Sequence, residues 1–151
     1  ANRGEKITVI FVNNAIYGMT GGQMAPTTMP QQKTTTSPLG RDVETTGYPM
    51  RVSELLATLA TPAFIARGSA HDGKHSMKLK KLIKQAFEYQ RDNTCFSFIE
   101  VLSTCPTNWG LSPDESDAWV ESTMMPYYPL GVFKQPEAPA PTAPAGASHG
   151  H

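Results

Sequence analysis

The sequence has no excess of charge of either sign, few cysteines and no long apolar run. Its 151 residues include 13 basic and 13 acidic side chains, so the formal net charge is zero. Nucleic acids and anionic membranes attract basic proteins, and this balance therefore indicates neither partner. No apolar stretch approaches the roughly 20 residues of a membrane-spanning helix, and the first residues do not read as a signal peptide. We expect a cytoplasmic protein.

The two cysteines are too few for a disulfide framework. Cys95 and Cys105 flank residues 96–102 (FSFIEVL), an apolar run that predicts a strand. The strand would hold them at its opposite ends, beyond the reach of a disulfide. We expect Cys95 to be a buried apolar residue. Cys105 follows the strand and could bind a metal or a cluster, although an iron–sulfur cluster ordinarily takes four cysteines.

Strand and helix patterns alternate along the middle of the chain. Residues 7–12 (ITVIFV), 63–67 (AFIAR) and 96–102 are mostly apolar, which is typical of buried strands. Residues 52–59 and 71–91 have helical periodicity. This alternation predicts an α/β fold with a parallel, doubly wound sheet.

The helix predicted over residues 71–91 has an apolar and a basic face. The apolar residues that recur at helical spacing are Leu79, Leu82, Ile83, Ala86 and Phe87. The lysines that face away are Lys78, Lys80, Lys81 and Lys84. They are most simply a solvated face, and the alternative is a docking surface for an acidic electron carrier.

The histidines give weak support for a metal site. His71 and His75 are four residues apart, a spacing that suits metal binding on a helix. Gly73 lies between them, however, and no carboxylate is evident that would complete the ligand set, so we expect no metal here. His149 and His151 could bind metal adventitiously, and we assign them no function.

The last third combines a strong helix start with a low-complexity tail. Ser-Pro-Asp-Glu at residues 112–115 supplies an N-cap, a first-turn proline and a capping box, and we expect this helix to end before Pro126. Residues 127–133 (YYPLGVF) predict an extended strap. Because residues 135–151 are rich in proline and alanine, we predict a domain over residues 1–134 and a disordered tail over 135–151.

The stretch 13–28 (NNAIYGMTGGQMAPTT) is the best candidate for a site. It begins where the first predicted strand ends, and ligands of parallel α/β sheets bind at that edge. Its glycines let backbone N–H groups approach a phosphate, but a turned loop without a ligand is the open alternative. The irregular segment continues to about residue 42. Within it, residues 31–37 could be a mobile arm, or a lid or subunit contact that orders in an assembly.

Four blocks of the sequence carry a resemblance to a known family. They are NRGEKITVIFVNNAIYGMTGGQMAPTT, SPLGRDVETTGYP, FSFIEVLSTCPTNWGLSP and MPYYPLGVFK. Residues 1–134 resemble the C-terminal part of the thiamine diphosphate-binding (β) subunit of 2-oxoacid:ferredoxin oxidoreductases, in the branch that acts on 2-oxoglutarate or 2-oxoisovalerate. The resemblance implies part of a thiamine diphosphate-binding fold, without its N-terminal strands, in a hetero-oligomeric enzyme. Such an enzyme oxidatively decarboxylates a 2-oxoacid to acyl-coenzyme A and reduces ferredoxin.

The resemblance also implies roles for individual residues. The Asn14 side-chain oxygen and the Ile16 carbonyl correspond to ligands of a Mg²⁺ ion that bridges the diphosphate, and hard oxygen ligands suit this ion. Cys105 matches one ligand of a [4Fe-4S] cluster whose other ligands would lie outside this segment. The other residues expected along the cofactor are Asn13, Tyr17, Gly18 and Thr20. No residue is expected to be a proton-transfer catalyst.

Parts of the family pattern are missing from this sequence. The Gly-Asp-Gly motif that holds the other side of the Mg²⁺ ion would precede Ala1, and further cluster cysteines are absent. Because a strand begins so early, we expect that an upstream part has been removed. Some relatives have lysine in place of Gly21, so the choice of 2-oxoacid stays open. Two readings remain: an oxidoreductase segment that is inactive without its partner subunits, or a non-catalytic fragment that serves subunit assembly.

Overall fold

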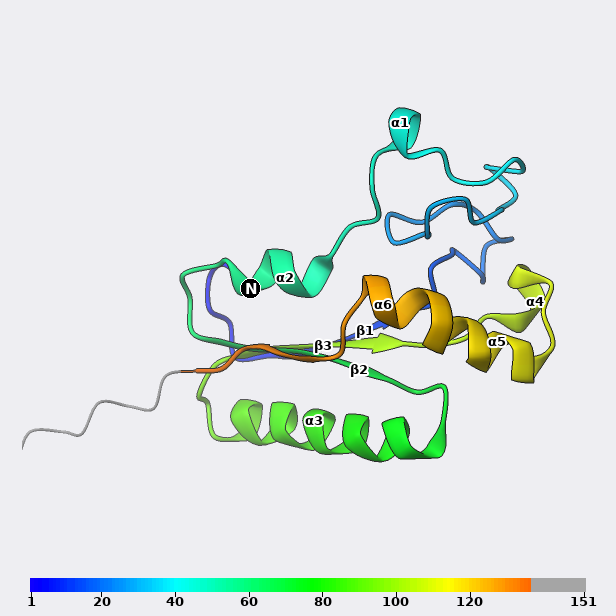
Figure 1. The fold of residues 1–151 in the computed structure, drawn as a ribbon. Helices are drawn as coiled ribbons and strands as arrows, with labels where there is room; N and C mark the ends of the chain where they lie inside the picture. Colours follow the sequence, from blue (N-terminus) through cyan, green and yellow to red (C-terminus); the bar gives the residue numbers. More distant parts are fainter. Residues whose placement is uncertain (137–151) are drawn as a thin grey trace, which may run out of the picture.

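The computed structural model describes residues 1–136 of the chain. These residues form a four-stranded sheet with helices against both of its faces, as Figure 1 shows. The tail predicted to be disordered lies outside the described residues from residue 137 onward. Within residues 1–136, no helix combines the length and the apolar character needed to cross a membrane.

The sheet is predominantly parallel and has the strand order β1-β3-β2-β4. Strands β1 (Thr8–Asn13), β3 (Phe96–Leu102) and β2 (Ala63–Ser69) run in the same direction. Strand β4 (Gly131–Lys134) pairs antiparallel with β2, so part of the predicted strap is an edge strand. The predicted α/β fold with a parallel sheet is confirmed, with one antiparallel edge.

Helices cover the sheet on both sides, which is the doubly wound arrangement. The long α3 (Gly73–Arg91) lies on one face and the short α2 (Val52–Ala57) on the other (Figure 1). The other helical elements are α1 (Val43–Thr46), α4 (Pro106–Trp109), α5 (Pro113–Trp119), the π-helical turn η1 (Val120–Met124) and α6 (Met125–Tyr127).

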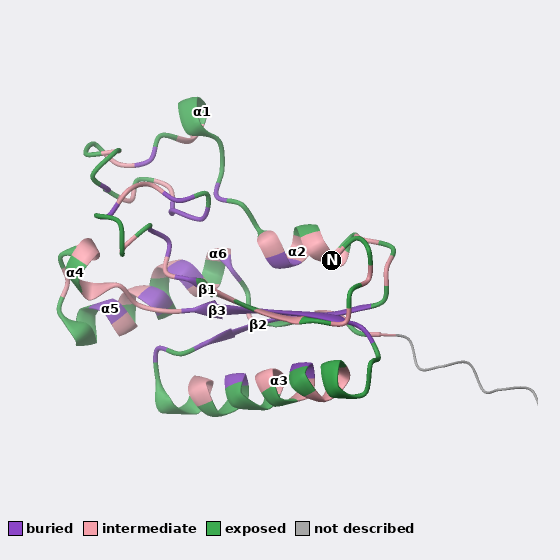
Figure 2. Cartoon of the chain, turned by 180° about the vertical axis from the view of Figure 1, so that it is seen from behind, coloured by how far each residue is buried: buried purple, intermediate pink, exposed green. Residues whose placement is uncertain are grey.

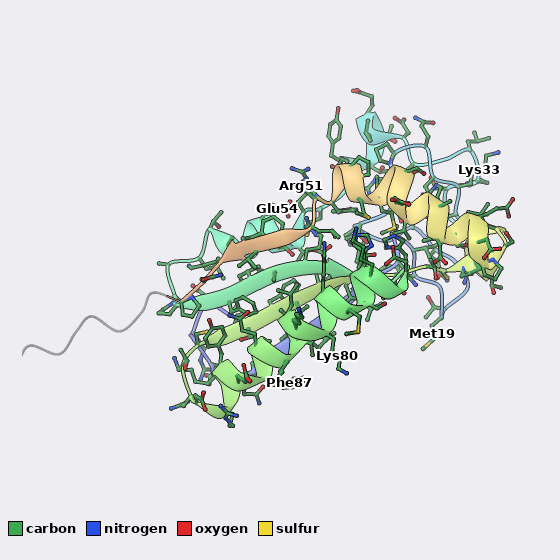
Figure 3. The ribbon with its side chains drawn as sticks, turned by 60° about the horizontal axis from the view of Figure 1, so that its bottom comes forward. Met19, Lys33, Arg51, Glu54, Lys80 and Phe87 are labelled. Atoms are coloured by element: carbon green, nitrogen blue, oxygen red, sulfur yellow. The ribbon has the colours of Figure 1, made fainter. Side chains whose placement is uncertain are left out.

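Helix α3 packs closely on the sheet through its apolar face. Leu79 and Ala86 are buried, and a Cβ added to Gly68 of β2 would lie only 2.8 Å from Leu79 Cδ1. Glycine at this position therefore permits the close approach of helix and strand. The expectation for Phe87 is wrong, because its side chain is 52% exposed. Figure 3 shows Phe87 and Lys80 on α3; Phe87 lies at the flank of the apolar stripe, one residue beyond Ala86.

The helix that begins after Ser112 has the predicted start but not the predicted end. The Ser112 hydroxyl accepts from the Glu115 N–H at 3.3 Å, and the Glu115 carboxylate accepts from the Ser112 N–H at 2.8 Å. Helical backbone nevertheless continues past Pro126 to the end of α6. Residues 120–124 form a π-helical turn, which shifts the hydrogen-bond register just before the proline that has no N–H to donate.

The long irregular segment after β1 is held together by Arg41, whose side chain is buried. Its guanidinium donates to the backbone carbonyls of Ala25, Pro26, Thr28, Thr46, Gly47 and Tyr48. Residues 31–37 join the same structure, since the Thr35 N–H donates to the Gly22 carbonyl at 2.9 Å. Figure 2 shows buried stretches here as well as along β2 and β3. The segment is irregular, as predicted, but it is packed and not extended as an arm.

Candidate functional site

The loop that follows β1 lies at the C-terminal edge of the parallel sheet, where α/β proteins bind ligands. Asn13 pairs with Leu102 at the end of β3, and the Ser103 N–H donates to the Asn13 carbonyl at 3.0 Å. The loop therefore starts beside the segment that leads to Cys105. The predicted placement of these two segments at one edge is confirmed.

The Asn13 side chain fixes the start of the loop. It is 1% exposed, its Nδ2 donates to Glu100 Oε1 at 2.8 Å, and its Oδ1 accepts from the Ala15 N–H at 3.0 Å. Both ends of the amide are occupied by protein groups. Asn13 thus positions the next residues and does not present its amide to a ligand.

Ala15 adopts a φ of 56°, in the left-handed region that an alanine rarely takes. Besides the bond from its N–H to Asn13, its carbonyl accepts from the Thr28 hydroxyl at 2.7 Å. Its side chain is fully buried. A strained residue that is held by several contacts is a common feature of functional sites.

Two oxygen atoms on either side of Ala15 have no hydrogen-bond donor. In the described part of the chain, neither the Asn14 side-chain amide nor the Ile16 carbonyl takes part in a hydrogen bond. Asn14 is half-buried and Ile16 is 4% exposed. Mg²⁺ prefers oxygen ligands, which asparagine side chains and backbone carbonyls can supply. These two groups therefore fit the ion expected here.

Gly18 is the point where the loop meets Cys105. A Cβ on Gly18 would lie 2.8 Å from Cys105 Sγ and 3.1 Å from Asn108 Nδ2, so a side chain does not fit. Asn108 Nδ2 donates to the Gly18 carbonyl at 3.2 Å and lies 3.3 Å from Cys105 Sγ. Gly22, with a φ of 81°, leaves room for the oxygen of the same amide. These two glycines allow Asn108 and Cys105 to lie directly against the loop.

Residues 17–23 form a tight turn that exposes backbone donors. The Tyr17 N–H donates to the Gln23 carbonyl at 3.0 Å, whereas the N–H groups of residues 18–20 have no acceptor within residues 1–136. Tyr17 is 52% exposed, and the Thr20 hydroxyl donates to Gln23 Oε1 at 2.6 Å. Met19 projects from the turn (Figure 3). Exposed backbone donors in a glycine-rich turn suit an anionic ligand such as a diphosphate.

A cavity of about 240 Å³ opens beside the same loop. Asn14 and Ile16 line it together with apolar side chains from the end of β1 and the start of α2. Val12, Tyr17 and Met50 around it are 58%, 52% and 47% exposed. Apolar walls with a few polar groups at one end are typical of sites for ring-containing cofactors.

A buried ion pair is hydrogen-bonded to the start of the loop through Asn13. Arg67 of β2 and Glu100 of β3 are fully buried, and Arg67 Nε donates to Glu100 Oε2 at 2.9 Å. The Ser53 hydroxyl donates to the same oxygen at 2.6 Å, while Asn13 donates to the other. Arg67 also pairs at 2.6 Å with Glu54, whose side chain is 28% exposed. These bonds tie the loop to the centre of the sheet.

The same network shifts two pKa values. Burial alone would raise the pKa of Glu54, but the hydrogen bonds from Arg67 and from its own backbone outweigh burial and lower this pKa below 4.5. Burial, and then the charge of Glu100, raise the pKa of Tyr128 far above its ordinary value. The Tyr128 hydroxyl therefore stays protonated and donates to the Thr27 carbonyl at 2.9 Å.

The two cysteines lie where the sequence predicted. Cys95 is fully buried just before β3, and burial raises the pKa of its thiol, as expected for an apolar residue. Cys105 follows β3, is partly exposed and forms the N-cap of α4. Both thiols are free.

The expectation that His71 and His75 lack a carboxylate partner is wrong. Asp72 lies between them, with Oδ2 at 2.8 Å from His75 Nδ1 and 3.5 Å from His71 Nε2. The spacing in the sequence did not show this, because the helix begins at Gly73 and not at residue 71. His71 and Asp72 therefore fold back beside the first turn of α3.

Comparison with known proteins identifies the family. Residues 1–101 match the C-terminal TPP-binding domain of thiamine pyrophosphate enzymes, where TPP is the pyrophosphate (diphosphate) of thiamine. The chain belongs to this family. The matched residues include β1 and the whole glycine-rich loop of the TPP-binding domain.

Named relatives of this TPP-binding domain are subunits of 2-oxoacid oxidoreductases. The chain is 46% identical over 138 residues to ketoisovalerate oxidoreductase subunit VorA of Methanothermobacter thermautotrophicus, which covers 91% of the chain and 29% of the relative. It is 39% identical over 110 residues to 2-oxoglutarate synthase subunit KorB of Methanothermobacter marburgensis. This match covers 73% of the chain and 34% of the relative. The chain thus spans about three-tenths of the length of the curated relatives that it matches.

The fold is similar to that of a solved oxidoreductase. A chain of 2-oxoglutarate:ferredoxin oxidoreductase from Magnetococcus marinus, with 2-oxoglutarate, coenzyme A and succinyl-CoA bound, has a TM-score of 0.63 and 23% identity. The similarity covers 92% of this chain and 50% of that one. At this identity the likeness shows a common fold. The sequence identity to the named oxidoreductase subunits confirms the predicted resemblance to this family.

Several residues that shape the candidate site are not evident from the sequence. Asn108 follows Cys105 by three residues and fills the space between two glycines of the loop. Glu100, Arg67 and Thr28 fix the turn around Ala15 from distant parts of the chain. The signal that could have revealed the ion pair is a charged residue inside an apolar strand, because such a charge needs a partner.

Proposed function

We propose that this chain supplies the Mg²⁺- and diphosphate-binding side of a TPP site in a 2-oxoacid:ferredoxin oxidoreductase. Such an enzyme converts a 2-oxoacid to an acyl-coenzyme A and reduces ferredoxin. The observation that carries the proposal is the pair of oxygens of Asn14 and Ile16, which lack donors within residues 1–136 and lie at the ligand-binding edge of the sheet.

The residues of the loop hold and orient the cofactor. The Asn14 side-chain oxygen and the Ile16 carbonyl would occupy two of the positions around an octahedral Mg²⁺ ion, and the cofactor and residues outside this chain would supply others. The strained backbone of Ala15 keeps the two oxygens in place. The free N–H groups of residues 18–20 would bind diphosphate oxygens. When bound, TPP supplies the group that reacts with the 2-oxoacid and stabilises the charge left when CO₂ departs.

Cys105 would be one ligand of a [4Fe-4S] cluster. Its sulfur lies against Gly18, and the Asn108 amide points at it from 3.3 Å, as donors to ligating sulfurs commonly do. The other ligands would come from outside this segment, since a cluster takes four. Electrons from the 2-oxoacid would then leave the TPP site beside the loop that holds the diphosphate.

The substrate that we propose first is 2-oxoisovalerate, and 2-oxoglutarate is second. The identity to the ketoisovalerate oxidoreductase subunit is 46%, compared with 39% to the 2-oxoglutarate synthase subunit. Coenzyme A, ferredoxin and the other subunits of a hetero-oligomer are the expected partners. The test uses the assembled complex and measures ferredoxin reduction with each 2-oxoacid in the presence of coenzyme A. Faster turnover with 2-oxoisovalerate supports the assignment, and a lack of turnover with every 2-oxoacid contradicts the function.

A second candidate is a non-catalytic role in subunit assembly. It is favoured by β1, an edge strand of the sheet whose apolar residues Ile10 and Val12 are 38% and 58% exposed. Apolar edge strands are usually covered by another element. Calorimetric titration with TPP and Mg²⁺ separates the two functions, because the assembly role predicts a stable complex that binds no cofactor.

A further inference from the structure

We propose that His71, Asp72 and His75 form a binding site for a divalent transition-metal ion such as Zn²⁺. They lie where β2 passes into α3, with β3 between them and the loop after β1. One ligand atom from each residue lies within 4.8 Å of the other two. The inference is independent of the proposed function, because it uses none of the residues assigned to the TPP site.

The strongest observation is the buried, unpaired nitrogen of His71. The side chain is 3% exposed, and Nε2 has no hydrogen-bond partner in the described part of the chain. Nδ1 lies 2.6 Å from the Ser69 hydroxyl, which in turn lies 3.4 Å from the Leu102 carbonyl. Because the Ser69 hydroxyl donates to that carbonyl, its oxygen can accept a hydrogen bond from the His71 Nδ1–H, and in this tautomer Nε2 carries a lone pair. Metal-binding histidines are usually oriented through their second nitrogen in this way.

Asp72 supplies a negative charge between the two imidazole rings. Its Oδ1 caps α3 by accepting the His75 N–H at 2.6 Å. Its Oδ2 faces both rings, at 2.8 Å from His75 Nδ1 and 3.5 Å from His71 Nε2. Zinc ligands at 2.0–2.2 Å from the ion stand about 3.3–3.5 Å apart. Small side-chain rotations would therefore bring the three atoms around one ion.

The cluster borders a cavity that can hold a further ligand. His75 and Ser69 line a cavity of about 540 Å³ between α3 and the end of β2. Three protein ligands and an open position are typical of zinc sites that bind water or another small ligand. Because Lys78 and Lys81 also line the cavity, that ligand should be an anion.

The donor set decides the kind of metal. Two imidazoles and one carboxylate favour Zn²⁺ and its neighbours over Mg²⁺ and Ca²⁺, which prefer oxygen. The positive end of α3 and the nearby Lys74 oppose a cation, so binding should be weaker than at a four-ligand structural zinc site. The oxygen-only pair Asn14 and Ile16 should have the opposite preference.

The test is titration of the intact chain with Zn²⁺, and with Co²⁺ followed by its visible spectrum. His149 and His151 are replaced by alanine in every sample, so that they contribute no ligand. We expect one Zn²⁺ ion to bind per chain, and binding to be weaker by about tenfold or more in His75→Gln. Binding of unchanged strength in His75→Gln, or no Zn²⁺ binding by the chain that lacks His149 and His151, overturns the proposal.

A second variant separates metal binding from folding. Asp72→Asn keeps an N-cap of equal strength but removes the charge. Thermal unfolding without metal should therefore change only slightly, through the charge lost at the start of α3, while Zn²⁺ affinity falls. Lys74→Ala, in the same turn of α3, is the matched control and should bind Zn²⁺ at least as tightly as the parent. Equal Zn²⁺ affinity in Asp72→Asn and the parent also overturns the proposal.

Discussion

The buried carboxylate of Glu100 should contribute more to stability than any exposed carboxylate. It accepts hydrogen bonds from Asn13, Ser53 and Arg67 at 2.8, 2.6 and 2.9 Å. The variant Glu100→Gln keeps the size of the side chain but replaces one accepting oxygen with an NH₂ group. This group would face another donor, and Arg67 would lose its fully buried counter-charge.

The size of the effect follows from burial. Removing one partner of a buried ion pair typically costs about 3–5 kcal/mol. Arg67 keeps its second partner, Glu54, so we expect the lower end, about 3 kcal/mol. The matched variant is Glu54→Gln, which loses a shorter contact to the same guanidinium, 2.6 Å, from a side chain that is 28% exposed. Because water compensates there, we expect a loss of about 1 kcal/mol or less.

Unfolding of the intact protein by heat and by urea measures both variants. A loss of 3 kcal/mol should lower Tm by roughly 6–12 °C in a domain of this size. Equal losses in the two variants, or a larger loss in Glu54→Gln, would refute the reasoning that burial and not distance sets the order. Because Asn13 bonds to Glu100, the Glu100→Gln variant should also bind Mg²⁺ and TPP more weakly.

Other contacts near the loop give three more predictions. Gly18→Ala should weaken TPP and Mg²⁺ binding about tenfold, which is about 1.4 kcal/mol, because the added Cβ would press on Cys105. The control is Gly73→Ala, whose Cβ would meet nothing within 4 Å, and calorimetry measures binding to both variants. Arg41→Lys should lower the free energy of unfolding in urea by about 2 kcal/mol, since one ammonium group cannot serve so many carbonyls. Because the pKa of Glu54 is lowered in the folded protein, its ion pair contributes fully to stability above pH 4.5, and this contribution is lost as the pH falls through the folded-state pKa. Glu54→Gln should therefore remove this part of the acid dependence of Tm.

For each of these three variants, one result would contradict the expected role of the residue. Unchanged cofactor affinity in Gly18→Ala would mean that the loop does not need the close approach of Cys105. Full stability of Arg41→Lys would mean that the irregular segment is held by other contacts. The same acid dependence with and without Glu54 would mean that its ion pair with Arg67 adds little.

The features that the sequence could predict depend on neighbouring residues. The apolar runs mark β1, β2 and β3 to within two residues, and the capping box at Ser112 marks the start of α5, because periodicity and first-turn chemistry are local. The position of Cys105 at the same edge as Asn14 follows from parallel topology.

The features that it could not predict depend on contacts between distant residues. Arg41 gathers carbonyls from two stretches of the irregular segment, and no local pattern shows this. Asp72 meets both histidines only because α3 begins one residue after it. The helix continues through Pro126 because a π-helical turn precedes it.

In the candidate site, too, some features depend on neighbouring residues and others on contacts between distant residues. The resemblance to the oxidoreductase family indicated Asn14 and Ile16, but not how the loop holds them. The positive φ of Ala15 and the bonds of Asn13 to Glu100 and of Thr28 to the Ala15 carbonyl became visible only in the structure. The proposed ligands lie in one short stretch, whereas Glu100, which positions them through Asn13, lies in a distant strand.

The central claim is that Asn14 and Ile16 hold the Mg²⁺ ion of a TPP site. Calorimetric titration of the assembled protein with TPP, with and without Mg²⁺, tests it most directly when the parent is compared with Asn14→Ala and with the exposed control Asn2→Ala. We predict that Mg²⁺ strengthens TPP binding in the parent and in Asn2→Ala but not in Asn14→Ala. The same strengthening by Mg²⁺ in all three proteins would contradict the claim.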